Sequence, residues 1–304
     1  MRIGVAATPA IAIPTLEWLR ESPHELARVI TRPDQPSGRG RHINASAVAQ
    51  WADQKNVPVI KPVAPTDMAA SLADLDIVIT IAYGVLLPIA IIELPKYGFI
   101  NLHFSLLPQW RGAAPVPRAI LNGDTQSGVT VFALDAGMDT GPIYIQKEVA
   151  IGARQNAGEV LQTMAAQGPE VIAQSLEMIS RGVPPTSQPH NGATLAPKIS
   201  KQEAQISWAN PAELIDRHIR AFTPVPGAWT TLRGEKMTIT SASVSDISLN
   251  APVGTIVVES GSVFVACAHQ SALRLEIVIP SGKKEMLAKS WMNGARLREG
   301  ELFE

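Results

Sequence analysis

Short apolar runs of strand length alternate with helix-like stretches through the first part of the chain. Residues 2–6 and 77–82 are runs of this kind, and the positions of Leu16, Trp18 and Leu19 predict a helix after the first of them. The remaining elements expected here are strands at 26–31 and 57–60 and helices at 46–56 and 69–73. Strands that alternate with helices predict an α/β fold with a parallel sheet covered on both faces.

The longest apolar run, residues 77–92, resembles a membrane span in composition. It is shorter than the roughly 18 residues that a span needs, and it contains Thr80, Gly84 and Pro88. It therefore predicts a strand, a turn and a helix, and we expect no membrane partner.

Further along, the pattern changes twice. Residues 114–122 and 159–181 predict helices, and 127–134 with 143–149 predict a β-hairpin. A segment rich in proline and polar residues follows, and after it come a helix at 212–222 and short alternating strands, which predict a small closed barrel. With 304 residues, about two domains are expected. We place them at 1–182 and 205–304, joined by a linker at 183–204.

Composition adds mostly exclusions. The formal net charge is -1, so no overall positive field points to nucleic acid. The single cysteine, Cys267, excludes an internal disulfide framework, and its strand-like surroundings favour a small buried hydrophobe over a catalytic thiol. The start of the chain is not signal-like, so we expect a cytoplasmic protein.

The candidate chemistry begins at Asn101 and His103. They are two residues apart at the end of an apolar strand, so both side chains should lie on the same face. An amide donor beside a titratable imidazole at the carboxyl end of a strand is typical of an active site in an α/β sheet.

A resemblance to a known family rests on this stretch and on several motifs elsewhere. Asn-x-His is followed by SLLPQWRGAAP and then by an aspartate in MDTGP. The other motifs are TRPDQPSGRGR, IAYGVLLP, LAPKISKQEAQISW and IRAFTPVPGAW. The chain resembles the folate-dependent formyltransferases over nearly its full length, with motifs far longer than a lone glycine pattern.

This resemblance implies a fold and a reaction. The fold would be a Rossmann-like formyltransferase domain with a mostly parallel sheet, followed by an OB-like β-barrel domain. The reaction would transfer a formyl group from 10-formyltetrahydrofolate to the amino group of initiator methionyl-tRNA. Asp139, an ordinary turn residue by composition, would face His103 and complete a catalytic group with Asn101.

The resemblance also implies where the folate co-substrate binds. In the family, the loop after strand 77–82 and the turn after His103 form the pterin slot. From composition alone Leu86 and Leu87 are core residues, and Arg111 is equally a structural cation or a substrate contact. Ser105 lacks the surroundings of a nucleophile. The expected folate-binding residues are Tyr83, Gly84, Leu86, Leu87, Ser105, Leu106, Leu107 and Pro108.

Contacts with tRNA are expected in two regions. Composition alone makes residues 32–44 a solvated loop, whereas the resemblance implies an insertion that reaches the acceptor end of the tRNA. Arginine suits that task because guanidinium groups pair with phosphates and base edges. The second domain has balanced charges, so its cations are ordinary surface residues until shown otherwise. The expected tRNA-binding residues are Arg39, Arg41, Lys198, Arg217 and Arg220; for Lys198 the sequence alone favours a role in pinning the linker.

The sequence departs from the family pattern at two positions after the first strand. Ala7 stands where the family usually has glycine, and Ile11 replaces its aromatic residue, which affects local packing. The first turn lacks the glycine pattern of a dinucleotide site, and the scattered histidines lack metal-ligand spacing, so we expect neither NAD nor a metal. The alternatives are a formyltransferase acting on a sugar amine or glycinamide ribonucleotide, a formyltetrahydrofolate hydrolase, and a non-catalytic RNA-binding or folate-binding module. We expect a monomer.

Overall fold

The computed structural model describes residues 1–37, 42–189 and 191–304. Its chain forms two compact units. Unit 1 comprises residues 1–115, 126–150 and 161–197, and unit 2 comprises residues 116–125, 151–160 and 198–304. Arg39 and Arg41 lie outside the described residues.

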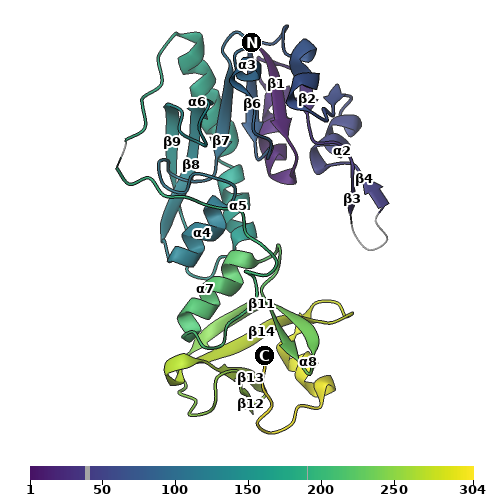
Figure 1. Ribbon diagram of the computed structural model, residues 1–304, viewed down its shortest axis with the longest axis vertical. Helices are drawn as coiled ribbons and strands as arrows, with labels where there is room; N and C mark the ends of the chain where they lie inside the picture. The colour runs from purple at the N-terminus through teal and green to yellow at the C-terminus, as the bar shows by residue number, and fades with distance from the viewer. Residues whose placement is uncertain (38–41, 190) are drawn as a thin grey trace. The chain divides into compact units, whose positions relative to one another are not determined.

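Unit 1 is built on a 7-stranded sheet with the order β5-β2-β1-β6-β7-β8-β9 (Figure 1). The strands are β1 (Arg2–Ala7), β2 (Glu25–Ile30), β5 (Val59–Ile60), β6 (Ile77–Ile81), β7 (Phe99–His103), β8 (Gln126–Ala133) and β9 (Ile143–Ala150). Neighbours from β5 to β7 are parallel, and β8 and β9 are antiparallel additions. The predicted α/β class with a mostly parallel sheet is confirmed.

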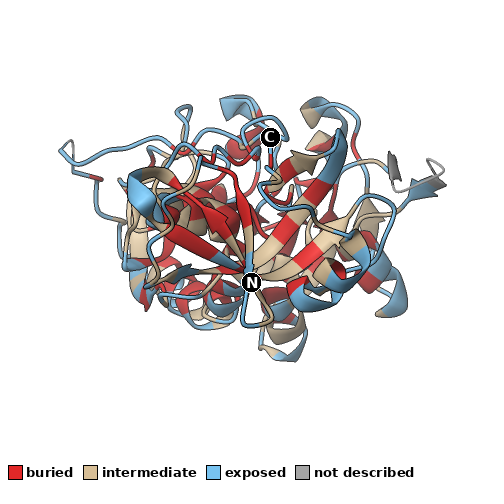
Figure 2. Cartoon of the chain, turned by 90° about the horizontal axis from the view of Figure 1, so that it is seen from below, coloured by how far each residue is buried: buried red, intermediate tan, exposed pale blue. Residues whose placement is uncertain are grey.

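The central strands owe their place to sequences that are mostly apolar. Every residue of β6 is buried, as a parallel strand between two covered faces requires, and Figure 2 shows buried positions running along the strands. The described helices of unit 1 include α1 (Ile13–Glu21), α2 (Ala47–Gln54), α3 (Ile89–Ile92) and α6 (Gly168–Ser180). Helix α6 packs on β8, β9 and α1, while α2 packs on β2 and β5.

The strand order places a switch point between β1 and β6. From β1 the chain moves outward to β2 and β5, and it then returns to the other side of β1 to form β6. Ligands of open α/β sheets bind outside the carboxyl ends of the strands at such a point. The loops after β1 and β6 therefore border the expected site, and a hydrogen bond from Thr8 Oγ1 to the Tyr83 carbonyl links them at 3.5 Å.

Three local predictions were wrong. The helix expected at 159–181 is two helices, α5 (Ala157–Ala165) and α6, because Pro169 lacks the N–H that would continue the first helix and lies instead in the first turn of the second. The helix at 69–73 is the 3-10 helix η2 (Pro65–Ser71). The loop at 32–44 contains a small antiparallel pair, β3 (Gln35–Ser37) and β4 (His42–Asn44).

Unit 2 contains a 6-stranded antiparallel sheet with the order β10-β11-β14-β13-β12 and β15 beside β14. Its strands are β10 (Trp229–Leu232), β11 (Glu235–Ser245), β12 (Ile256–Glu259), β13 (Ser262–Ala266), β14 (Ala272–Pro280) and β15 (Met286–Leu287). Helix α7 (Ala212–Phe222) packs on β11 and β14, and α8 (Ala288–Ala295) packs on β13 and β14. Helix α4 (Pro115–Asn122) lies mostly in this unit.

Residues 301–304 connect the two edge regions of this sheet. On the β12 side, the Ile256 N–H donates to the Glu301 carbonyl at 2.8 Å, and the Phe303 N–H donates to Gly254 at 2.9 Å. On the β10 side, Thr231 and Glu304 exchange backbone hydrogen bonds of 3.0 and 3.3 Å. The chain itself thus spans the gap that strand pairing leaves open.

The segment expected to be a linker is attached to unit 1 over much of its length. Residues 183–197 belong to that unit, and Thr186 exchanges backbone hydrogen bonds of 2.7 and 2.8 Å with Ile143. The domain bounds given above remain a prediction. Within the described part of the chain, no helix has both the length and the apolar character that crossing a membrane requires.

Candidate active site

Asn101 and His103 lie on β7, as their spacing predicts. Asn101 sits beside Thr80 of β6, whose Oγ1 donates a hydrogen bond of 2.9 Å to the Asn101 Oδ1. The Thr80 hydroxyl also lies 3.2 Å from the Ile100 carbonyl, and its contact with Asn101 is to the amide oxygen and not to the NH2 group. Asn101 is therefore presented as a hydrogen-bond donor.

The imidazole of His103 is buried, with 6% of the residue exposed. Its Nε2 lies 2.9 Å from the Trp110 carbonyl oxygen, and since a carbonyl only accepts, Nε2 must donate the proton. In the neutral ring Nδ1 is then unprotonated. Burial lowers the pKa of His103, while the Asp139 carboxylate and the Trp110 carbonyl oppose that shift, so the ring is a neutral base near pH 7.

Asp139 lies in the connection between β8 and β9, and its carboxylate faces the same imidazole. Asp139 Oδ2 is 3.8 Å from His103 Nδ1 and accepts a hydrogen bond of 2.7 Å from the Gly112 N–H. Gly112 has a φ of 124°, and a Cβ there would lie 2.7 Å from the Ala196 carbonyl oxygen, so only glycine fits. The distance to Nδ1 leaves the carboxylate as an electrostatic neighbour of the ring, while the Trp110 carbonyl orients it.

The residues expected to hold folate fall into two groups by exposure. Tyr83 is buried in the cluster that contains Met68 and Phe99, so it is a core residue of unit 1. Leu86 is 82% exposed, Gly84 is exposed and Leu87 is partly buried. Of this loop, Gly84 and Leu86 are the members whose surfaces a ligand can reach directly.

Several polar groups of the turn after β7 are already hydrogen-bonded within the protein. The Leu107 N–H donates to Thr130 Oγ1 at 3.2 Å, and its carbonyl accepts from Gln146 Nε2 at 2.8 Å. The Ser105 carbonyl accepts from Thr130, and its hydroxyl donates to the Gln109 carbonyl at 2.6 Å. A buried turn satisfies its polar groups internally, so Leu106 and Pro108 are the half-buried members left at its surface.

The expected tRNA-binding cations are placed differently from one another. Lys198 is exposed. Arg220 forms an ion pair of 2.8 Å with Asp216, one turn away on α7, and only 15% of its side chain is exposed. The Arg217 guanidinium packs over Gly123 within unit 2. Arg220 also donates to the Gln155 carbonyl at 3.3 Å, so its guanidinium is largely used within unit 2.

Sequence reasoning did not single out the residues that orient this site. Thr80, Trp110 and Gly112 act through hydrogen bonds to Asn101, His103 and Asp139. Arg111, which the sequence left open, binds the side chain of Gln188 at 2.6 Å. Arg111 and Gly112 lie in the RGAAP segment and Gln188 in SQPHNGATLAP, and neither segment has a hydrophobic period that reveals a contact.

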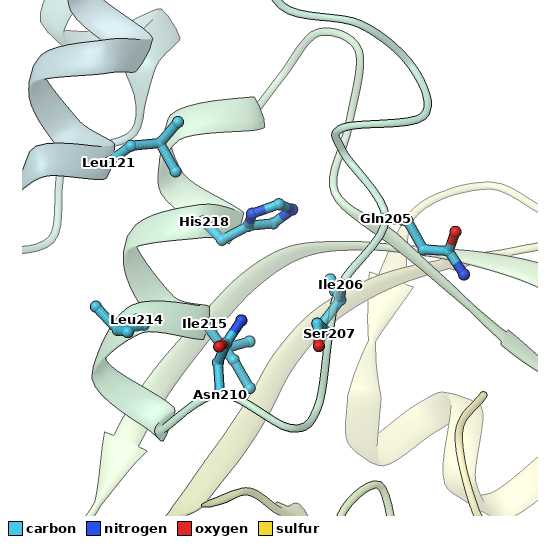
Figure 3. A pocket seen from close by; sticks show the side chains of 8 residues that line it. All are labelled: Leu121, Gln205, Ile206, Ser207, Asn210, Leu214, Ile215 and His218. Atoms are coloured by element: carbon cyan, nitrogen blue, oxygen red, sulfur yellow. The ribbon is translucent and has the colours of Figure 1, made fainter.

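A cavity of about 300 Å³ lies in unit 2 (Figure 3). It is lined by Leu121, Gln205, Ile206, Ser207, Asn210, Leu214, Ile215 and His218. None of Asn101, His103 and Asp139 is among these residues, so the cavity is separate from the candidate catalytic group.

Two other kinds of site find no support among the described residues. In residues 1–37, 42–189 and 191–304, no cluster of three or more His, Cys, Asp or Glu side chains is suited to a metal ion. Cys267 is buried, and burial raises the pKa of its thiol to about 12, which keeps it protonated and unreactive at neutral pH.

This fold and this site define an α/β protein equipped for proton transfer and hydrogen bonding at the carboxyl end of a parallel sheet. Residues 1–176 match the family described as formyl transferase, and residues 198–296 match the formyl transferase C-terminal domain. The chain belongs to the formyl transferase family.

Individual relatives extend the match over the whole chain. It is 41% identical to a methionyl-tRNA formyltransferase of Salinispora arenicola, covering 100% of both chains, and 42% identical to one of Rhodococcus erythropolis, covering 98% of both. An N-formyltransferase structure of Helicobacter canadensis, in complex with folinic acid and dTDP-3-aminofucose, has a TM-score of 0.69 at 17% identity, covering 90% of this chain and 98% of that one. A methionyl-tRNA formyltransferase of Clostridium thermocellum has a TM-score of 0.58 at 17% identity, covering 81% and 94%. These two structures support the fold alone.

Proposed function

We propose that this protein transfers the formyl group of 10-formyltetrahydrofolate to the α-amino group of initiator methionyl-tRNA. The observation that carries the proposal is the arrangement of Asn101, His103 and Asp139 at one end of β7, in a chain about 40% identical over its full length to enzymes with that name. The folate derivatives named in related structures support the choice of co-substrate.

The reaction needs a neutral amine, and an α-amino group with a pKa near about 8 supplies a useful fraction of it at neutral pH. The amine nitrogen attacks the formyl carbon and a C–N bond forms. The carbonyl oxygen becomes an oxyanion, which the Asn101 NH2 group stabilises by donating a hydrogen bond.

His103 is suited to take the proton that the attacking amine loses. Its Nδ1 is unprotonated in the neutral ring because Nε2 donates to Trp110. Once protonated, the imidazolium lies 3.8 Å from the Asp139 carboxylate, which stabilises it. The same proton then returns to N10 of the folate as the bond from N10 to the formyl carbon breaks, and tetrahydrofolate leaves.

The acceptor is the part of the proposal that rests most on the relatives. We infer that Arg39 and Arg41 read the acceptor end of the tRNA and that Lys198 and Arg217 add phosphate contacts. Arg220 contributes less because it pairs with Asp216. We also propose that the protein is a monomer and is located in the cytoplasm.

The test is an incubation of the purified protein with 10-formyltetrahydrofolate and charged initiator methionyl-tRNA. Formylmethionyl-tRNA and tetrahydrofolate should appear in equal amounts. Parallel reactions with a nucleotide-linked amino sugar, with glycinamide ribonucleotide and with water alone test the alternative acceptors. Faster transfer to any of these would reject methionyl-tRNA as the substrate.

An Arg39→Ala variant tests the reading of the tRNA. We expect slower formylation of the initiator with unchanged affinity for folate, because the proposed folate residues lie after β6 and β7. Equal loss of folate affinity would assign this loop to the catalytic pocket.

A further inference from the structure

Gln188 uses every hydrogen-bonding group of its side chain, and all of its partners lie around the candidate catalytic group. Its Nε2 donates to the Asp139 carbonyl at 2.9 Å and to the Gly141 carbonyl at 2.8 Å. Its Oε1 accepts from Arg111 Nε at 3.2 Å and Nη2 at 2.6 Å. Since carbonyls only accept and guanidinium only donates, the orientation of the amide is fixed.

The main chain of Asp139 needs such support. Its φ is 53°, in the left-handed region that residues other than glycine seldom occupy. The neighbouring Met138 is 53% exposed, so little apolar packing holds this part of the connection. The two bonds from Gln188 act on the carbonyls of Asp139 and Gly141, on either side of the Thr140 residue. They restrain the backbone from which the Asp139 carboxylate projects.

The same amide restrains the loop on the other side of His103. Arg111 follows Trp110, whose carbonyl accepts from His103 Nε2, and precedes Gly112, whose N–H donates to Asp139. Gln188 therefore joins the two loops that face the two nitrogens of one imidazole.

Gln188 is itself firmly placed, as a positioning residue must be. Only 9% of it is exposed. Before it, Thr186 pairs with Ile143 through two backbone bonds, and after it, the Thr194 carbonyl and hydroxyl accept from the Arg111 and Trp110 N–H groups at 2.9 and 2.8 Å. The side chain lies between two anchored points of unit 1.

We propose that Gln188 is a positioning residue of formyl transfer, which holds the Asp139 carboxylate against His103 by fixing the backbone of the Asp139 connection. The proposal rests on the function proposed above and adds to it a residue from the segment that sequence reasoning assigned to a linker. Gln188 touches no reacting atom, and its effect passes through Asp139.

A double-mutant cycle with Asp139 tests this route. Gln188→Met keeps the length of the side chain and removes all four hydrogen bonds. We expect it to lower kcat by roughly 10-fold with the KM for 10-formyltetrahydrofolate changed less than about 2-fold, because an interaction that acts only in the transition state lowers kcat. In an Asp139→Ala background the same substitution should lower kcat by less than about 2-fold, since residues that act through one another are not additive.

Two further variants separate positioning from stability. Gln50→Met is the matched control, because the Gln50 amide also donates to a backbone carbonyl, that of Ala45 at 2.9 Å, at an exposed position on α2. It should leave kcat unchanged. Gln188→Glu keeps acceptors for Arg111 and loses both donors to the Asp139 connection, so it should be as slow as Gln188→Met.

The Gly112 amide proton gives a readout that needs no formyl transfer. Its NMR shift reports the hydrogen bond to Asp139 Oδ2, and Gln188→Met should move it in the same direction as Asp139→Ala. A wild-type protein that transfers no formyl group would reject the proposed function while this shift still tests the positioning. The positioning is overturned if Gln188→Met keeps the wild-type Gly112 shift, or if it lowers kcat equally in both backgrounds.

Discussion

Each of the two units contains a histidine whose pKa is lowered by burial, and the two are not equivalent, since His103 is buried and His218 is half-buried. His103 has the Asp139 carboxylate and the Trp110 carbonyl opposing that shift, and His218 of α7 has the backbone of Ala204 and the Glu203 carboxylate. Burial, a nearby carboxylate and a backbone partner are therefore common to both.

The two histidines differ in what faces the ring nitrogen that is not hydrogen-bonded to the backbone. His218 packs on Phe222 with ring centroids 4.5 Å apart, and its Nε2 has no hydrogen-bond partner among the described residues. His103 ends a parallel strand beside Asn101, with Nδ1 facing a carboxylate. A lowered pKa marks burial in both cases; the oriented neighbours at the strand end mark the candidate catalyst.

Replacing the two histidines should give the largest contrast. His103→Ala should lower kcat by roughly 100-fold or more, because it removes the proton acceptor, and Asn101→Ala and Asp139→Ala should each do the same. His218→Ala should change kcat by less than about 2-fold when assayed below its unfolding temperature. Formylation rates and circular dichroism measure the effects. Near-normal turnover in folded His103→Ala would reject its role.

Removing the hydrogen bond that orients Asn101 should have a smaller effect on kcat. Thr80→Val keeps the shape of a buried side chain and removes the hydroxyl that donates to Asn101 Oδ1. Without that bond the amide can turn its oxygen toward the oxyanion, and we expect kcat to fall roughly 10-fold, the equivalent of one hydrogen bond. An unchanged kcat at normal stability would mean that other contacts fix the amide.

Removing the Asp139 and Glu203 carboxylates one at a time should lower the pKa of the neighbouring histidine in each case. The effects on formylation should then separate the roles of the two histidines. Asp139→Asn removes the charge that raises the pKa of His103, so that pKa should fall further, and Glu203→Gln should lower the pKa of His218. NMR titration of the imidazoles measures both. Only Asp139→Asn should change the pH dependence of formylation, and an equal change in Glu203→Gln would contradict the assignment of His103.

Acid stability should show the smallest effect. For His218 the folded pKa lies below its ordinary value of 6.5, so below pH 6.5 the unfolded chain takes up a proton that the folded chain does not. Stability is therefore lost as the pH falls from 6.5 toward the folded pKa. His218→Phe should flatten this slope by at most about 1.4 kcal/mol per pH unit. Urea unfolding at a series of pH values downward from about 6.5 measures it.

The sequence predicts elements better than contacts. The apolar run of β6 and the spacing of Asn101 and His103 identify the sheet and its reactive end, because side-chain direction in a strand follows from period alone. The break between α5 and α6 follows from Pro169, but the helical pattern of apolar residues continues on both sides of it and indicates a single helix.

The contacts that orient the candidate catalytic residues cannot be predicted from the sequence, for a different reason. Trp110 acts through its carbonyl, a group that every residue has, and Gln188 lies 49 residues from Asp139 in a segment with no hydrophobic period. Nothing local to either residue specifies such a contact. Asp139 itself was found only through a resemblance, because an acid in a glycine-rich turn is ordinary.

The segment 301–304 has a consequence for how unit 2 behaves in a crowded solution. Strands at the edge of a sheet offer unpaired backbone groups to other chains and invite aggregation. Here Phe303, stacked on Trp208 and Trp291 at 5.4 and 6.1 Å, fastens a short strip of chain that hydrogen-bonds to Gly254 and Ile256 near one edge and to Thr231 on the other. This segment covers both edges of the sheet with a few residues. If it detached locally, without unfolding of the unit, unpaired backbone groups at both edges would become accessible to other chains at once.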